Sequence, residues 1–110
     1  MPRNELIIYE GAMCCSTGVC GPEPDQELIA LNETIKKLQG EYNGQLDIIR
    51  ASLAFNSLMF FTNKEVLQLV KDNGQEILPI TAINGEIVAR QKYLKYDEIK
   101  ILLAERIEHE

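Results

Sequence analysis

The order of apolar segments in the first half of the chain restricts its fold more than any other feature. Residues 5–9, ELIIY, form a short apolar run with β-branched side chains, which is typical of a buried strand. Residues 24–39 carry a helical apolar pattern, and residues 45–50 return to a strand pattern. A strand, a helix and a strand in this order favour a right-handed crossover between parallel strands. We therefore expect an α/β fold.

The first predicted helix has signals at both ends. Pro24 and acidic residues stand in its first turn, Lys36 and Lys37 stand in its last turn, and Gly40 follows it. These positions match the polarity of a helix, which favours acidic groups near its N-terminus and basic groups near its C-terminus. The expected buried face consists of Leu28, Leu31, Ile35 and Leu38.

A second helix is predicted over residues 63–73. Thr62 and Glu65 have the spacing of a capping box, and Gly74 follows the last apolar residue. Residues 54–63 before it are expected to be irregular or to form a single turn. We expect four apolar side chains of this segment to lie in the core: Phe55, Leu58, Phe60 and Phe61.

The last third of the chain predicts a hairpin and a helix. Asn84 and Gly85 join two short apolar runs, residues 79–83 and 86–89, and accept the positive φ angles of a type I′ turn. These runs should pair as antiparallel strands. Residues 95–107 then place apolar side chains in helical register: Ile99, Leu102, Leu103 and Ile107.

The predicted order β-α-β-α-β-β-α, with a mixed four-stranded central sheet, is the thioredoxin-like arrangement. Residues 1–110 contain no repeat or linker, so we expect one domain. The first strand ends at a cysteine-rich segment that leads into the first helix. Pro79 opens the hairpin strand, and in this element order we favour a cis peptide bond before it, facing that segment.

The charge balance is acidic, with 11 basic and 17 acidic residues and a net charge of -6. This balance gives no support for nucleic-acid binding as a dominant activity, because phosphate recognition needs clustered cations. No run approaches the length of a membrane span, and the N-terminal apolar run is too short for a signal peptide. We therefore expect a cytoplasmic protein with no membrane partner.

Cys14, Cys15 and Cys20 are the only cysteines, and they lie within seven positions. A domain of this size needs no disulfide to fold, and a cysteine cluster in a reducing compartment is typical of metal-binding or catalytic sites. Single cysteines also pack in cores. Three on a polar, glycine-containing segment make packing the weaker hypothesis.

The spacing of the cysteines separates three further hypotheses. A thioredoxin-type redox centre has two residues between its cysteines, whereas four separate Cys15 from Cys20, so oxidoreductase activity is the alternative rather than the first choice. Structural zinc takes four ligands, and only His109 or acidic Glu10 could add a fourth. Three thiolates without a fourth ligand suit trivalent arsenic or antimony, and the helix N-terminus favours the thiolate form at Cys20.

The residues MCCSTGVCG, together with DQEL, SLAFN, FTNKEV, LPI and NGEIV further along, resemble the ArsD family of arsenical resistance operons. The resemblance implies a cytosolic metallochaperone and not an enzyme. Its three essential metalloid ligands correspond to Cys14, Cys15 and Cys20, and no cofactor would be permanently bound. The implied cargo is As(III) or Sb(III), taken from glutathione complexes and delivered to the ArsA ATPase of an efflux pump.

Members of the family have also been regarded as weak metalloid-responsive transcriptional repressors that act as dimers. The resemblance therefore also implies a homodimer with weak operator DNA binding. Two features depart from the family pattern. No cysteine follows Cys20, although some members carry further pairs near the C-terminus, and the net charge of -6 gives DNA binding no visible support.

Overall fold

The structure is a computed structural model that describes residues 4–11, 26–42, 44–53 and 57–107. Its strands are β1 (Asn4–Glu10), β2 (Leu46–Ser52), β3 (Ile80–Ile83) and β4 (Glu86–Arg90). Its helices are α1 (Gln26–Tyr42), α2 (Lys64–Asn73) and α3 (Tyr96–Ile107), with 3₁₀ turns η1 (Ser57–Phe61) and η2 (Gly74–Ile77). The predicted order of strands and helices is confirmed.

The four strands form one mixed sheet in the order β2-β1-β3-β4. β1 pairs with β2 in parallel, from Asn4 opposite Leu46 to Glu10 opposite Ser52. β1 and β3 are antiparallel, and so are β3 and β4. β1 is therefore an inner strand, and the fold is thioredoxin-like, as the sequence predicts.

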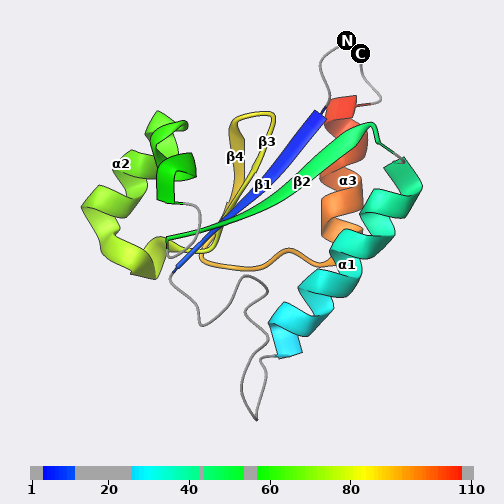
Figure 1. Ribbon diagram of the computed structural model, residues 1–110, viewed down its shortest axis with the longest axis horizontal. Helices are drawn as coiled ribbons and strands as arrows, with labels where there is room; N and C mark the ends of the chain where they lie inside the picture. The colour runs from blue at the N-terminus through cyan, green and yellow to red at the C-terminus, as the bar shows by residue number, and fades with distance from the viewer. Residues whose placement is uncertain (1–3, 12–25, 43, 54–56, 108–110) are drawn as a thin grey trace.

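The sheet lies between α2 on one side and α1 with α3 on the other (Figure 1), and each side holds an apolar cluster. Successive side chains of β1 point to opposite faces, as they must in a strand. Leu6 joins a cluster with Leu38 of α1 and Leu103 of α3, whereas Ile7 joins a cluster with Val66 of α2. Thus α1 and α3 cover one face, and η1 and α2 cover the other.

Helix α1 extends past its predicted end. It continues through Gly40 to Tyr42, so the prediction of an end at residue 39 is wrong. Glycine weakens a helix by only about 1 kcal/mol relative to alanine, and tertiary contacts override that cost here. Tyr42 packs against the α1–α3 apolar cluster, and the carboxylate of Glu41 accepts hydrogen bonds from Tyr96 and Lys100 of α3.

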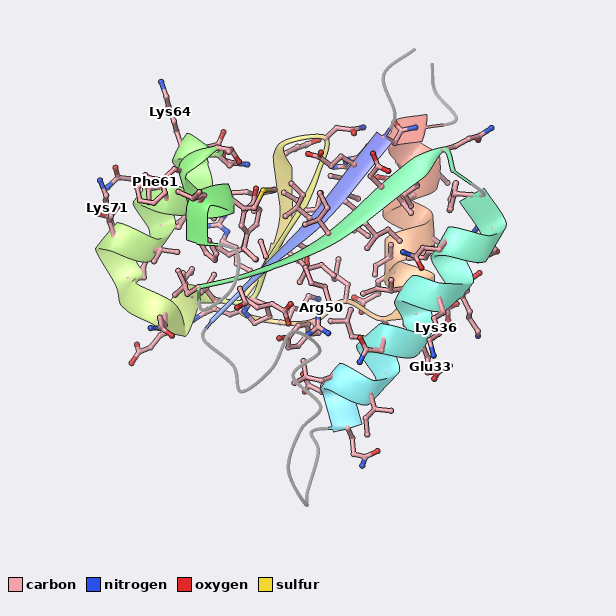
Figure 2. The ribbon with its side chains drawn as sticks, in the orientation of Figure 1. Glu33, Lys36, Arg50, Phe61, Lys64 and Lys71 are labelled. Atoms are coloured by element: carbon pink, nitrogen blue, oxygen red, sulfur yellow. The ribbon has the colours of Figure 1, made fainter. Side chains whose placement is uncertain are left out.

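The apolar segment before α2 is only partly buried. Phe60 is buried and meets Tyr9 edge-on, with 5.2 Å between ring centroids. Leu58 and Phe61 are 78% and 64% exposed, so their prediction as core residues is wrong. Residues three apart share a face of a 3₁₀ turn. With Phe60 directed into the core, Leu58 and Phe61 therefore lie together on an outer face of η1, and Phe61 is labelled in Figure 2. Phe55 lies outside the described residues.

Asn63, and not Thr62, caps the N-terminus of α2. Its Oδ1 accepts hydrogen bonds from the backbone N–H groups of Glu65 (3.1 Å) and Val66 (3.3 Å). The Thr62 hydroxyl instead donates to the carbonyl of Met59 at 2.7 Å. The prediction of a capping box at Thr62 and Glu65 is therefore wrong, because the cap lies one residue later and Val66 occupies the third helical position. The predicted end at Gly74 is confirmed, because Gly74 has φ 72° at the C-cap.

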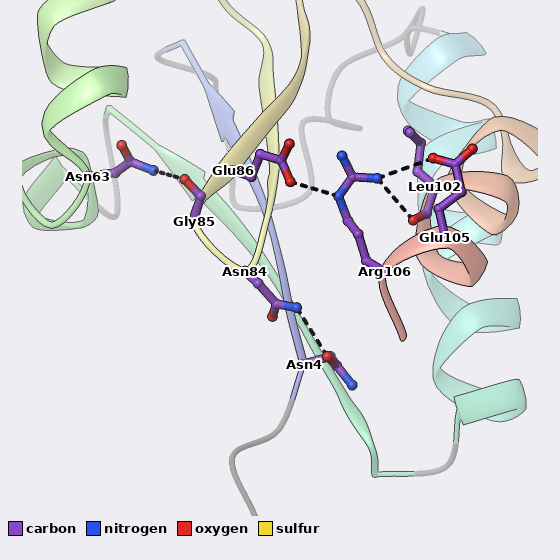
Figure 3. Close-up of polar contacts among 8 residues, drawn as sticks. All are labelled: Asn4, Asn63, Asn84, Gly85, Glu86, Leu102, Glu105 and Arg106. Carbon is purple, nitrogen blue, oxygen red and sulfur yellow. Dashed lines mark hydrogen bonds and ion pairs between the residues drawn. The ribbon is translucent and has the colours of Figure 1, made fainter. Parts of the chain in front are cut away.

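The hairpin turn at Asn84 and Gly85 is confirmed, with φ angles of 51° and 86°. Its tip is fastened on both sides (Figure 3). Asn63 donates to the Gly85 carbonyl at 3.2 Å, and Asn84 donates to Oδ1 of Asn4 at 3.1 Å. These contacts fix this end of the sheet.

Candidate functional site

The predicted metalloid ligands Cys14, Cys15 and Cys20 lie outside the described residues. The structure does describe both flanks of residues 12–25, which we call the cysteine segment. β1 ends at Glu10 before it, and α1 begins at Gln26 after it. The chemistry of these two flanks can therefore be analysed.

A buried ion pair lies where β1 ends. Glu10 is 1% exposed, and its two carboxylate oxygens face the guanidinium of Arg50 on the neighbouring strand β2. Nε of Arg50 donates to Oε2 at 2.8 Å, and Nη2 donates to Oε1 at 2.7 Å. This is the two-pronged geometry in which an arginine binds a carboxylate most strongly.

Two more side chains complete this arrangement. The Tyr93 hydroxyl donates to Oε1 of Glu10 at 2.6 Å, and Tyr93 belongs to the connection between β4 and α3. The remaining nitrogen of Arg50, Nη1, donates to Oδ1 of Asn32 on α1 at 3.0 Å. We call Glu10, Arg50, Tyr93 and Asn32 the Glu10 cluster; Figure 2 labels Arg50 on the α1 side of the sheet.

The cluster favours the charged form of Arg50. Burial disfavours the charged form of Arg50, but the hydrogen bonds and charge of Glu10 outweigh this effect and raise the pKa of the guanidinium above its ordinary value. Arg50 is therefore a permanent cation. Every buried side-chain nitrogen and oxygen that the structure describes has a hydrogen-bond partner.

This arrangement bears on the zinc hypothesis, which needed Glu10 or His109 as a fourth ligand. Both oxygens of Glu10 already accept hydrogen bonds from Arg50 and Tyr93, so zinc coordination by this carboxylate would compete with a buried ion pair. His109 lies outside the described residues. In the part of the chain that the structure describes, no group of three or more His, Cys, Asp or Glu side chains could hold a metal ion.

A cavity of about 230 Å³ lies beside the cluster, between α1 and the residues that precede α3. Its walls are largely apolar, and Glu27, Tyr93 and Lys95 contribute polar groups. Tyr93 thus faces both this cavity and Glu10. The two charged residues among its described lining, Glu27 and Lys95, are both exposed.

The Leu78–Pro79 peptide bond is cis, which confirms the prediction for Pro79. Pro79 directly precedes β3, whose first residue, Ile80, pairs with Tyr9 near the end of β1. Pro79 therefore lies at the end of the sheet that leads into the cysteine segment. The predicted contact between them concerns residues outside those described.

Sequence patterns did not reveal the Glu10 cluster. Two signals were available: Glu10 ends an otherwise apolar strand, and Arg50 is a lone cation within the apolar run of β2. A charge in such a run is rarely buried without a partner. Asn32 and Tyr93 gave no signal, because their roles depend on contacts between distant parts of the chain.

The sequence of the chain is similar to those of known proteins. The family model described as "Arsenical resistance operon protein ArsD" matches residues 3–110. A Halobacterium salinarum protein that carries the name arsenical resistance operon repressor ArsD is 46% identical over 96 residues, which cover 87% of each chain. The arsenical resistance operon trans-acting repressor ArsD of Escherichia coli is 34% identical over 94 residues, which cover 86% of this chain and 76% of that protein.

A similar structure has also been solved. The arsenical resistance operon trans-acting repressor from Bacteroides vulgatus superposes with a TM-score of 0.78 at 28% sequence identity, and the match covers 92% of both chains. Within the residues that the structure describes, every helix is too short or too polar to cross a membrane.

Proposed function

The chain belongs to the ArsD family of arsenical resistance operon proteins, and from this membership we propose that it is a carrier for trivalent arsenic or antimony. Cys14, Cys15 and Cys20 are the proposed ligands, in a single domain formed by residues 1–110. The observation that carries the proposal is the family match over residues 3–110, which includes the only three cysteines of the chain. Three soft thiolates suit a metalloid that forms three sulfur bonds.

The proposed activity is transfer and not catalysis. A thiolate of the acceptor forms a bond to arsenic, and one cysteine sulfur leaves and takes up a proton; three such exchanges move the metalloid without changing its oxidation state. Glutathione complexes would supply As(III) or Sb(III), and the ArsA ATPase of an efflux pump would receive it. We propose that this happens in the cytoplasm, where thiols stay reduced.

A direct test is titration of the reduced protein with arsenite. We expect three thiols to disappear for each metalloid bound, and X-ray absorption at the arsenic edge to report three sulfur neighbours. Cys14→Ser, Cys15→Ser and Cys20→Ser should each weaken binding strongly, whereas Ser16→Ala, in the same segment, should not. Unchanged binding in Cys20→Ser would disprove the three-thiolate site.

A second role, as a weak metalloid-responsive repressor, is supported by the names of the relatives. It predicts a homodimer that retards operator DNA in a gel and releases it when arsenite is added. The net charge of -6 opposes DNA binding, so the assay is most sensitive at low salt. A lack of retardation there would exclude this role.

The alternative activity, thiol-disulfide exchange by Cys15 and Cys20, is supported only by the thioredoxin-like fold. Folds host many unrelated functions, so this support is weak. A disulfide-reduction assay distinguishes the two proposals: an oxidoreductase turns over disulfide substrate, whereas a carrier is inert.

A further inference from the structure

One guanidinium connects the two flanks of the cysteine segment. Arg50 donates two hydrogen bonds to Glu10, the last residue of β1, and a third to Asn32 of α1. Glu10 stands four residues before Cys14 in the sequence, and α1 begins six residues after Cys20. The strand that enters the segment and the helix that leaves it are therefore joined through one side chain.

Stability alone is a poor explanation for this arrangement. A buried ion pair loses hydration on burial, and an apolar side chain of similar size is often equally stabilising at the same place. What a two-pronged pair does provide is a fixed geometry. Apolar contacts of Leu38 already hold α1 against the sheet. The hydrogen bond to Asn32 therefore serves mainly to fix how the helix is oriented on the sheet.

We propose that the Glu10 cluster is a positioning device that fixes the end of β1 relative to α1 and thereby sets how slowly the bound metalloid is released. This inference rests on the proposed function. Three sulfurs that share one atom must converge, and a ligand set whose supports are held in place loses less freedom when it binds. Hydrogen-bond partners of metal ligands orient those ligands directly, whereas this cluster would orient the elements on either side of them.

Two variants test the proposal without removing the ion pair itself. Asn32→Ala deletes the acceptor on α1, and the higher helix propensity of alanine offsets part of the cost of removing this hydrogen bond. Tyr93→Phe deletes the hydrogen bond to Oε1 of Glu10 and keeps the ring beside the cavity. Neither residue is a proposed metalloid ligand.

The control breaks an ion pair at the opposite end of the sheet. Nε of Arg106 on α3 donates to Oε2 of Glu86 on β4 at 3.1 Å (Figure 3). Glu86 pairs with Ile83, which pairs with Leu6, whereas Glu10 ends β1. Glu86→Gln therefore loosens the contact of α3 with the sheet away from the cysteine segment.

The measurement is the release of arsenite from loaded protein into excess dithiothreitol, together with the number of thiols per bound arsenic and the midpoint of urea unfolding. We expect Asn32→Ala and Tyr93→Phe to release arsenite roughly tenfold faster than wild type, the lower end of the effect of outer partners on metal sites. Three thiols per arsenic should be retained, and both variants should remain folded in the absence of urea, where release is measured. Glu86→Gln should release at the wild-type rate.

Two results would overturn the inference while leaving the carrier function intact. In the first, both cluster variants release arsenite at the wild-type rate. In the second, Glu86→Gln accelerates release as much as they do, which would mean that general loosening is responsible. If wild type binds no arsenite through three thiols, the proposed function fails, and this inference fails with it.

Discussion

At the scale of single residues, Asn63 links two parts of the fold. Its side-chain oxygen caps α2, and its nitrogen donates to Gly85 in the turn between β3 and β4. The sequence pattern favoured Thr62 as the cap because Thr62 precedes Glu65 by three residues, the spacing of a capping box. Asn63 instead accepts from the N–H groups of Glu65 and Val66, one position later, and only the structure distinguishes the two caps.

We predict that Asn63→Ala lowers the free energy of unfolding by about 1 kcal/mol, the usual cost of losing an N-cap. Asn63→Ser keeps a capping oxygen and should recover most of that loss. Urea denaturation of the three proteins measures the difference. Equal losses in both variants would show that the bond to Gly85, and not the cap, carries the effect.

The contacts of the Glu10 cluster could not be predicted from local sequence patterns. From the sequence, Glu10 was considered as a fourth metal ligand because it lies near the cysteines. Its partner Arg50 is 40 residues away, and Tyr93 is 83 residues away. Pairing across such distances depends on strand register, which local patterns do not contain.

At the scale of the secondary-structure elements, the first turn of α3 is stabilised by its own acidic side chain. Oε1 of Glu98 accepts a hydrogen bond from the backbone N–H of Lys95 at 3.1 Å, and Oε2 lies 3.3 Å from Nζ of Lys92. The bond from Lys95 and the nearby lysines lower the pKa of Glu98 below its ordinary value of 4.5. An acidic group at this position also complements the helix dipole.

The lowered pKa gives this contact a pH dependence. The folded state holds the charged form of Glu98 more strongly than the unfolded state does, so the contribution is complete above about pH 4.5 and is lost as the pH falls through the lower pKa of the folded protein. We predict that Glu98→Gln lowers the Tm at pH 7 and that its difference from wild type is smaller at pH 3. Thermal melts followed by circular dichroism at both pH values measure this; the same difference at both would contradict the assignment.

The types of the helices and strands were predictable because their periodicity is local. The residues at which they end were harder to predict. The hairpin at Asn84 and Gly85 needs backbone angles that few other residue pairs accept, and it was predicted correctly. The end of α1 was not, because contacts of Glu41 and Tyr42 with α3 outweigh the helix-breaking tendency of Gly40. Leu58 and Phe61 were mistaken for core residues because hydrophobicity alone does not tell which face of a short turn points inward.

At the scale of the whole molecule, the two apolar clusters share one sheet. β1 contributes Leu6 to the cluster under α1 and α3, and it contributes Ile7 and Tyr9 to the cluster under α2. Because the same strand supports both layers, loss of either layer removes one face of the inner strand. The layers should therefore unfold together.

We predict that Leu103→Ala, in the layer of α1 and α3, and Phe60→Ala, in the layer of α2, each lower the free energy of unfolding by about 3 kcal/mol. In both variants, urea unfolding followed by circular dichroism and by tyrosine fluorescence should give one coincident transition. Separate transitions in either variant would show that the two layers fold independently.

The fixed flanks also determine when chain entropy is lost. Gly11 and Gln26 border the cysteine segment, and the elements that hold them form when the protein folds. Closing a chain of this length between two fixed ends costs roughly 2 kcal/mol of loop entropy. This entropy is lost when the protein folds. Binding of a ligand to the segment therefore does not require it to be lost again. Cutting the backbone within the segment would transfer this entropy loss from folding to binding, although every ligating side chain would still be present.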